Sequence, residues 1–364
     1  MSALNPSKPP IHISAASGVF PAGPGLALAS AALQAGQALN RLHPFYVDGM
    51  GQRVACAYFA EPAGFDFERW QELARAALLD LAPRVPRHDA AGRERAHHLL
   101  LVLPELHRAG LPDALSQRLV KACEGGPFRW LSVRVVHGGH AAGVQAVEQA
   151  MADISPMRAT DPSASFVVLA VDSWVHPDAL QWLEQEDLLH GSRKPYKGQV
   201  HVNAYGRVPS EGAAALWISR TPGLCQIAGL AMAQEPVLRG ENRPTTGQGW
   251  TQAAQTALTM WARSQDHTGH GPLREMEVVW SDLNGEPYRA DQFGFTGLRL
   301  SGWLKDNWKS VTPATVFGDL GSASAVAHMA LAAQVLSGAG QAQTHLLLSA
   351  SDDAWRGAMV LRGD

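Results

Sequence analysis

The sequence predicts an α/β fold built around a mainly parallel or mixed sheet. Short apolar runs alternate with amphipathic stretches along most of the chain, which is the pattern of repeated strand and helix units. A second series of such units begins after Pro222 and roughly repeats the first. With 364 residues and 46% hydrophobic content, the chain can bury one large core or two tightly fused halves.

The first series contains the clearest helix and strand patterns. Phe65 to Leu81 places apolar residues three and four positions apart behind an acidic first turn, which predicts a helix with one buried face. The apolar run from His98 to Leu103 predicts a buried strand. The series continues with a helix at Asp113 to Ala122, a strand at Leu131 to Val136, a helix within HGGHAAGVQAVEQAM, and strands at Phe166 to Ala170 and Ala213 to Ser219.

The second series follows the same alternation. Its predicted elements are a strand at Cys225 to Met232, a helix at Gly249 to Arg263, a strand at Met276 to Trp280, a helix at Gly321 to Leu336, and strands at His345 to Ser349 and Ala358 to Leu361. No Pro-rich or Gly-rich stretch is long enough to separate independent domains.

Composition excludes several classes of function. A formal net charge of −3 leaves no basic surplus for nucleic acid or for an anionic membrane surface. No apolar run approaches the roughly 20 residues of a membrane span, and the amino terminus has no signal-peptide pattern. Cys56, Cys123 and Cys225 form no CxxC pair, so we expect neither a disulfide framework nor a zinc site, and we expect a cytoplasmic protein.

Several phrases, in order, resemble the β-ketoacyl synthases (3-oxoacyl-ACP synthases) of the thiolase superfamily. HGGHAAGVQAVEQA resembles the family's nucleophile turn and its following helix, of the "GLQAVHLA" type. VLAVDSWVHPDALQWL is similar to the strand and helix around "GGVDS", and VPSEGAAALWIS to the "GEGAAALVLE" strand. VVWSDLNGEPYRAD and FGDLGSASAVAHMALAA stand where the family has "HGTGTPLGD" and "GHTLGAAG".

The resemblance implies a five-layer αβαβα fold made of two similar halves. We place these halves at residues 1–221, with the nucleophile-turn equivalent at 137–150, and at residues 222–364. It also implies a homodimer and a chemistry of acyl groups carried as thioesters. It implies no cofactor and no metal.

The residues that would perform this chemistry are replaced. The family's cysteine nucleophile matches His140, and its two histidines match Asp282 and Asp319. Its lysine matches Ala314, and its "GFGG" loop matches the segment from Ser351 to Gly357. An ionised carboxylate cannot donate a hydrogen bond to a developing oxyanion, so ordinary condensation is not expected.

Two interpretations of the replacements remain open. In the first, Asp282 caps a turn and Asp319 caps the helix that begins near Gly321, both common uses of aspartate. In the second, His140, Asp282 and Asp319 converge as a hydrolytic or metal-binding trio.

Two functions follow from these interpretations. The first is a non-catalytic or weakly catalytic accessory protein, a dimeric pseudoenzyme scaffold that binds a partner synthase, an acyl carrier protein or a secreted effector protein. The second is an acyltransferase or thioester hydrolase that uses His140 as a base, with Asp282 and Asp319 orienting it.

Overall fold

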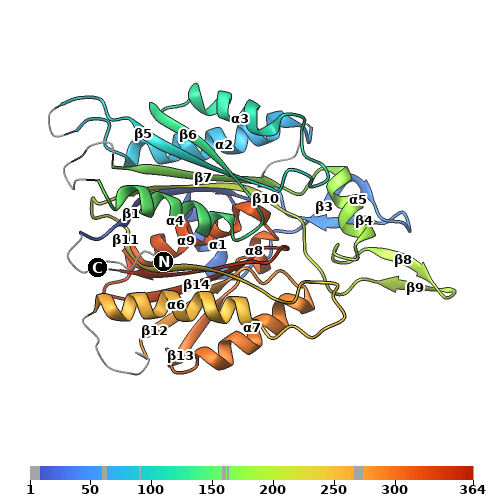
Figure 1. The fold of residues 1–364 in the computed structure, drawn as a ribbon. Coiled ribbons are helices and arrows are strands. Elements are labelled where there is room, and N and C mark those ends of the chain that lie inside the picture. Colours follow the sequence, from blue (N-terminus) through green and yellow to red (C-terminus); the bar gives the residue numbers. More distant parts are fainter. Residues whose placement is uncertain are drawn as a thin grey trace.

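The computed structural model describes residues 9–59, 64–89, 92–157, 161, 164–265 and 274–363. Its main strands form one hydrogen-bonded order, β13-β12-β14-β15-β11-β1-β10-β7-β5-β6, with the short β2 (Gly23–Pro24) beside β1. β1 and β11 share only two residue pairs, which are His12 with Gln226 and Ile13 with Cys225. The sheet therefore divides at this seam into two layers (Figure 1).

The two layers repeat one pairing pattern. The first contains β1 (His12–Phe20), β10 (Glu211–Ser219), β7 (Phe166–Ser173), β5 (His97–Leu103) and β6 (Trp130–His137). The second contains β11 (Cys225–Gln234), β15 (Trp355–Arg362), β14 (Thr344–Ala350), β12 (Met276–Ser281) and β13 (Leu304–Val311). From the seam outward, each layer has two antiparallel pairings and then two parallel ones. The structure thus confirms the expected fold of two similar halves.

Helices fill the space between the two layers and cover their outer faces (Figure 1). The central helices are α1 (Leu26–Ala35), α4 (Ala142–Ile154), α8 (Ala314–Phe317) and α9 (Ser324–Gly338), the last preceded by the short η2 (Gly321–Ala323). The outer helices are α2 (Phe67–Leu81) and α3 (Leu115–Glu124) on one side, with η1 (Ala82–Arg84) after α2, and α6 (Gln248–Ser264) and α7 (Pro287–Leu300) on the other. Three apolar cores match these interfaces, giving the five layers expected from the resemblance. No helix among the described residues is long and apolar enough to cross a membrane.

A smaller lobe projects from one end of the layers (Figure 1). It contains the hairpin β3 (Arg41–Val47) and β4 (Arg53–Cys56), α5 (Pro177–Gln185), and the hairpin β8 (Arg193–Tyr196) and β9 (Gln199–Val202). The buried Asp48 joins the two hairpins, because its Oδ2 accepts a hydrogen bond from the backbone N–H of Arg193 at 2.8 Å. Large apolar side chains are exposed on this lobe, among them Phe45 at 70% and Val200 at 53%.

The predicted elements occur within a few residues of their expected bounds, whereas the strands of the two lobe hairpins, α7 and β13 were not predicted. The two hairpins of the lobe have few buried residues, so their sequences lack the alternation of a half-buried strand. α7 buries the polar Arg289, Gln292 and Thr296, so no apolar periodicity indicated it. β13, LKDNWKSV, is a largely polar edge strand.

The crossing of α4 and α9 holds the central layer together at Gly143. A Cβ at this position would lie 2.8 Å from Cγ2 of Val326 and 2.9 Å from Cβ of Ala325. The two helices can therefore approach this closely only when position 143 carries no side chain.

We expect Gly143→Val to lower the free energy of unfolding by about 1–3 kcal/mol, because the added groups overpack this contact. Gly294→Ala is the matched control, since Gly294 lies in α7 with nothing within 4 Å of a built Cβ. The control should be neutral or stabilising by up to about 1 kcal/mol. Urea unfolding of both variants measures the difference, and equal stabilities would contradict the tight crossing.

Three histidines are buried in different elements of the core. Burial lowers the pKa of His97 on β5, His328 on α9 and His345 on β14 to about 4. The hydrogen bond from Trp280 Nε1 to His345 Nδ1, at 3.2 Å, likewise needs an unprotonated Nδ1. The folded protein thus holds these rings neutral at pH values where the unfolded chain protonates them.

The protein should therefore be acid-sensitive. Because the folded-state pKa values are depressed, the stability from neutral rings is present above about pH 6.5 and is lost as the pH falls toward 4. Each ring should contribute a slope of about 1 kcal/mol per pH unit near pH 5. Urea unfolding at several pH values should show this slope, and His328→Gln should reduce it by the share of one ring, about 1 kcal/mol per pH unit. A flat profile from pH 7 to 5 would contradict it.

Candidate functional site

The turn between β6 and α4 carries His140. Gly139 in this turn lies close to the segments that follow β5 and β14, because a Cβ here would come within 2.8 Å of Glu105 Oε1 and 2.9 Å of Ser351 Cβ. The backbone N–H of Ala141 donates to Ser351 Oγ at 3.0 Å. These contacts place His140 at the amino end of α4, with only 2% of its surface exposed.

Asp319 lies between α8 and η2 and combines two roles. Its Oδ1 accepts a hydrogen bond from the backbone N–H of Gly321, the first residue of η2, at 2.7 Å, although Leu320 is the N-cap residue of η2. The same oxygen is 2.6 Å from Nε2 of His140. Its Oδ2 accepts from Asn284 Nδ2 at 2.7 Å and lies 3.4 Å from Nε of Arg207. The Asp319 carboxylate therefore both binds the backbone at the start of η2 and contacts the His140 ring.

Both ring nitrogens of His140 are occupied. Nη2 of Arg289 lies 3.1 Å from Nδ1 of the ring, and a guanidinium can only donate. In the neutral ring, Nδ1 therefore accepts and the hydrogen on Nε2 is donated to Asp319. In the protonated ring, both nitrogens carry a hydrogen. Neither nitrogen has a lone pair available to take a proton from a substrate or a water molecule while these contacts last.

Asp282 follows β12 and joins it to β14. Its Oδ2 accepts from the backbone N–H of Ala350 at 2.7 Å and from Ser349 Oγ at 2.9 Å. The same oxygen lies 3.4 Å from Nη1 of Arg289. The carboxylate therefore spans two strands, whereas the sequence suggested a cap for the turn beside Asn284.

Two buried arginines connect the site. Arg207 pairs with Glu286, with Asp319 and, at 3.1 Å, with Asp352. Arg289 contacts Asp352 at 2.8 Å in addition to its contacts with His140 and Asp282. Both arginine side chains have at most 2% of their surface exposed. Their guanidinium groups therefore lie among four carboxylates and have been removed from water.

The buried charges shift the pKa values of the site. Burial raises the pKa of Asp319, but His140 and Arg207 more than offset it and hold that pKa well below its usual range. Burial and Arg289 lower the pKa of His140, whereas Asp319 raises it, and the net shift is upward. Asp352 behaves like Asp319, because Arg207 and Arg289 outweigh its burial and depress its pKa. Asp319 and Asp352 are thus acceptors, not acids, at neutral pH.

The three predicted site residues lie in one region, but only two of them are in direct contact. His140 and Asp319 are in direct contact, and Asp282 joins them through Arg289. No group of three or more His, Cys, Asp or Glu side chains among the described residues is arranged to hold a metal ion. His140, Asp282 and Asp319 therefore lie in one cluster, in which Arg289 connects His140 with Asp282.

Sequence reasoning missed the residues that connect the trio. Arg207 lies in an irregular segment between β9 and β10, so no pattern indicated it. Arg289 stands in the first turn of the helix after the Asp282 loop, and Asp352 stands in the segment matched to the "GFGG" loop. A signal did exist for these two, since a charge placed in a loop already matched to an active site is a candidate for it.

The cysteines offer no substitute nucleophile. All three are buried. Burial and Glu211 raise the pKa of Cys56 far above its usual range, and burial and Glu124 raise that of Cys123 to about 12. These two residues therefore remain thiols at neutral pH.

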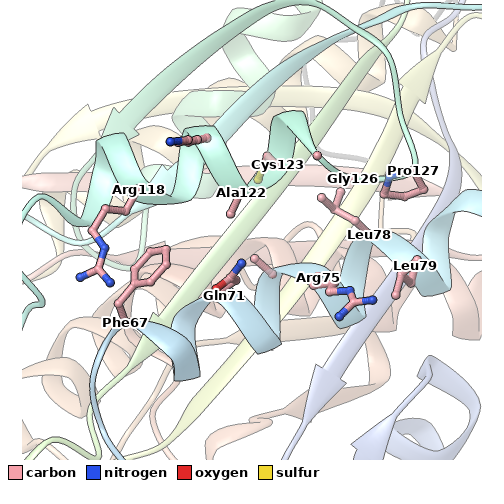
Figure 2. A pocket seen from close by; sticks show the side chains of 13 residues that line it. Phe67, Gln71, Arg75, Leu78, Leu79, Arg118, Ala122, Cys123, Gly126 and Pro127 are labelled. Carbon is pink, nitrogen blue, oxygen red and sulfur yellow. The ribbon is translucent and has the colours of Figure 1, made fainter.

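A cavity of about 870 Å³ lies elsewhere, on the outer face of the first layer. It is lined by side chains of α2 and α3 and by the residues that follow α3 (Figure 2). None of the residues of the His140 site lines it. This cavity, called below the groove between α2 and α3, is therefore separate from the His140 site.

Comparison with known proteins identifies the fold. No family model matches the sequence, and no curated protein matches it. Solved structures do match. A chain from the complex of a type II PKS acyl-carrier protein with its ketosynthase, bound to the hexaketide, has a TM-score of 0.72 at 13% identity, covering 98% of this chain and 100% of its own length.

Two ketosynthase domains match similarly. The oxazolomycin ketosynthase domain of Streptomyces albus JA3453 has a TM-score of 0.70 at 14% identity, over 98% of this chain and 75% of that one. The ketosynthase from module 6 of the bacillaene synthase of Bacillus subtilis 168 has a TM-score of 0.69 at 12% identity, over 98% and 72%. Two halves with one pairing pattern and these matches over nearly the whole chain lead to one conclusion: the protein has the thiolase-like fold of the ketosynthases.

Proposed function

We propose that this chain is a non-catalytic ketosynthase-like protein that acts by binding a partner. The observation that carries the proposal is the state of His140, which is 2% exposed and has both ring nitrogens engaged, by Asp319 and by Arg289. At the position that the resemblance equates with the nucleophile, the chain thus presents neither a thiolate nor a free base.

The remaining site residues also work against condensation. A ketosynthase reaction needs hydrogen-bond donors where negative charge develops. Asp319 and Asp282 instead accept hydrogen bonds here, and each lies against a guanidinium. Nη2 of each arginine is hydrogen-bonded to Asp352, whereas Nη1 of Arg207 has no hydrogen-bond partner among the described residues.

An acyltransferase or thioester hydrolase is the alternative, favoured by the 2.6 Å contact between His140 and Asp319, which resembles a base with its orienting carboxylate. Such a base must have its second nitrogen free for the substrate. Here that nitrogen, Nδ1, accepts from Arg289. The alternative would therefore require Arg289 to leave the ring.

Surface features support a binding role. Exposed large apolar side chains gather on the projecting lobe, as at Phe45 and Val200. Such patches are typical of protein–protein contact sites. A partner synthase, an acyl carrier protein or a secreted effector protein would be a suitable partner, and one structural match is to a ketosynthase bound to an acyl-carrier protein.

We also propose a homodimer. β6 is the outermost strand of its layer and is paired only with β5 among the described strands. The free edge of β6 is open to pairing with a second chain, and Leu131 on this strand is half-exposed.

The proposal predicts no turnover of acyl thioesters. The purified protein, incubated with a panel of acyl- and malonyl-coenzyme A, should show neither an added mass by intact mass spectrometry nor release of free thiol. His140→Ala should behave identically, and an active ketosynthase serves as the positive control. Thiol release that disappears in His140→Ala would establish the hydrolase or acyltransferase instead.

The proposal also predicts that Arg289 stabilises the site. Arg289→Met should lower the free energy of unfolding by about 3–5 kcal/mol, because Asp282 and Asp352 would lose a buried partner. Arg263→Met removes the same charge from an exposed position in α6 and should change stability by less than about 0.5 kcal/mol. Chemical denaturation measures both, and a fully stable Arg289→Met would show that the arginine does not hold the site together.

A further inference from the structure

The groove between α2 and α3 is an open, partly apolar channel on the outer face of the first layer (Figure 2). Phe67 and Leu78 from α2 and Ala122 from α3 contribute to its apolar lining. Leu79, one residue further along α2, also lines it and exposes 49% of its surface. Its volume of about 870 Å³ lies in the upper part of the range of binding pockets.

The charged residues of the groove are all cationic. Arg75 from α2 and Arg118 and Lys121 from α3 line it, and no Asp or Glu does. Arg118 covers the ring of Phe67, with its guanidinium carbon 3.8 Å from the ring centre. The groove thus carries three positive side chains beside apolar surface, whereas the whole chain has a formal net charge of −3.

Three acidic residues lie beside the groove but outside its lining. Glu68 and Glu72 lie on the neighbouring strip of α2, and Glu124 follows Cys123 at the end of α3. Glu68 is 3.7 Å from Arg118, and both side chains are exposed, so water screens the pair. Glu72 lies 3.6 Å from Arg69, which is buried and directed toward the core. The lining itself therefore presents positive side chains, and the acidic ones lie at its margins.

We propose that this groove binds an amphipathic helix of acidic character from a partner protein. The proposal rests on the proposed binding function and names the surface and the chemistry of the partner. A groove between two helices accepts the ridge of a third helix, whose apolar face covers the floor. Acidic side chains along the flanks of that helix would pair with Arg75, Arg118 and Lys121.

The length of the groove suits such a helix. α2 has 15 residues, so it is about 22 Å long. About four turns of a bound helix could lie along it. Leucine-type side chains at positions i, i+3, i+4 and i+7 would contact Leu79 and the apolar lining between the helices.

The test uses the full-length protein and a synthetic helical peptide of about 14 residues, long enough to be held helical by a staple. Its apolar face carries leucines at i, i+3, i+4 and i+7, and its other positions are Glu and Ala. The control peptide has Lys in place of each Glu. Fluorescence anisotropy should show saturable binding of the acidic peptide that weakens as salt rises, and at least about tenfold weaker binding of the basic one.

Matched variants locate the site. Leu79→Glu should weaken binding of the acidic peptide at least about tenfold, whereas Leu298→Glu, at a leucine that is 75% exposed on α7, should not change it. Replacing Arg75, Arg118 and Lys121 together with Glu, which reverses their charge, should abolish binding of the acidic peptide. Reversal of the exposed Arg53, Arg263 and Lys309, which lie outside the groove, should weaken binding less than twofold.

Three results would overturn the proposal. The first is equal affinity for the acidic and basic peptides, which needs no variant to fold. The second is unchanged binding in Leu79→Glu. The third is binding of dodecanoate in the groove without any binding of the peptide, which would assign a small anionic amphiphile. Acyl thioester turnover with intact peptide binding would refute only the non-catalytic function, and loss of peptide binding without turnover would refute only the groove.

Discussion

The structure depends on a buried charge network where its two halves meet. Arg207 and Arg289 hold together residues from the loops after β12 and β14 and from the turns before α4 and η2. Removing so many charges from water is costly, and it is offset only when every partner is present with good geometry. A network of this kind fixes the relative positions of the loops more than it adds net stability.

The same network decides what the site can do. A thiolate nucleophile requires a helix amino end whose N–H groups are free to stabilise an anion. At the start of α4, the backbone N–H of Ala141 is instead directed at Ser351, and the His140 ring lies between Asp319 and Arg289. The arginines compensate the carboxylates that replace the expected histidines. His140 and Asp319 are thus engaged inside the protein, whereas Asp282 Oδ1 and Arg207 Nη1 have no hydrogen-bond partner among the described residues.

The scaffold itself is retained. The two layers keep the same order of antiparallel and parallel pairings, and the central helices still pack at Gly143. The chain therefore has the same fold as solved ketosynthases at only 12–14% sequence identity. A fold depends on apolar patterning, whereas chemistry depends on a few polar side chains. The exposed lobe and the groove between α2 and α3 are the surfaces through which we propose that this body binds its partners.

The sequence by itself determined the elements whose burial follows a simple period, such as α2 and β5, and the order of the two series, because apolar spacing alone specifies which face is buried. It also placed His140, Asp282 and Asp319 in one region through the resemblance. Only the tertiary structure decided that α7 is a helix, because its buried face carries Arg289 and Gln292, which read as surface residues in a sequence. Only the tertiary structure placed Arg207 against Asp319 as well, since the two residues are far apart in the chain and meet through the folding of both halves.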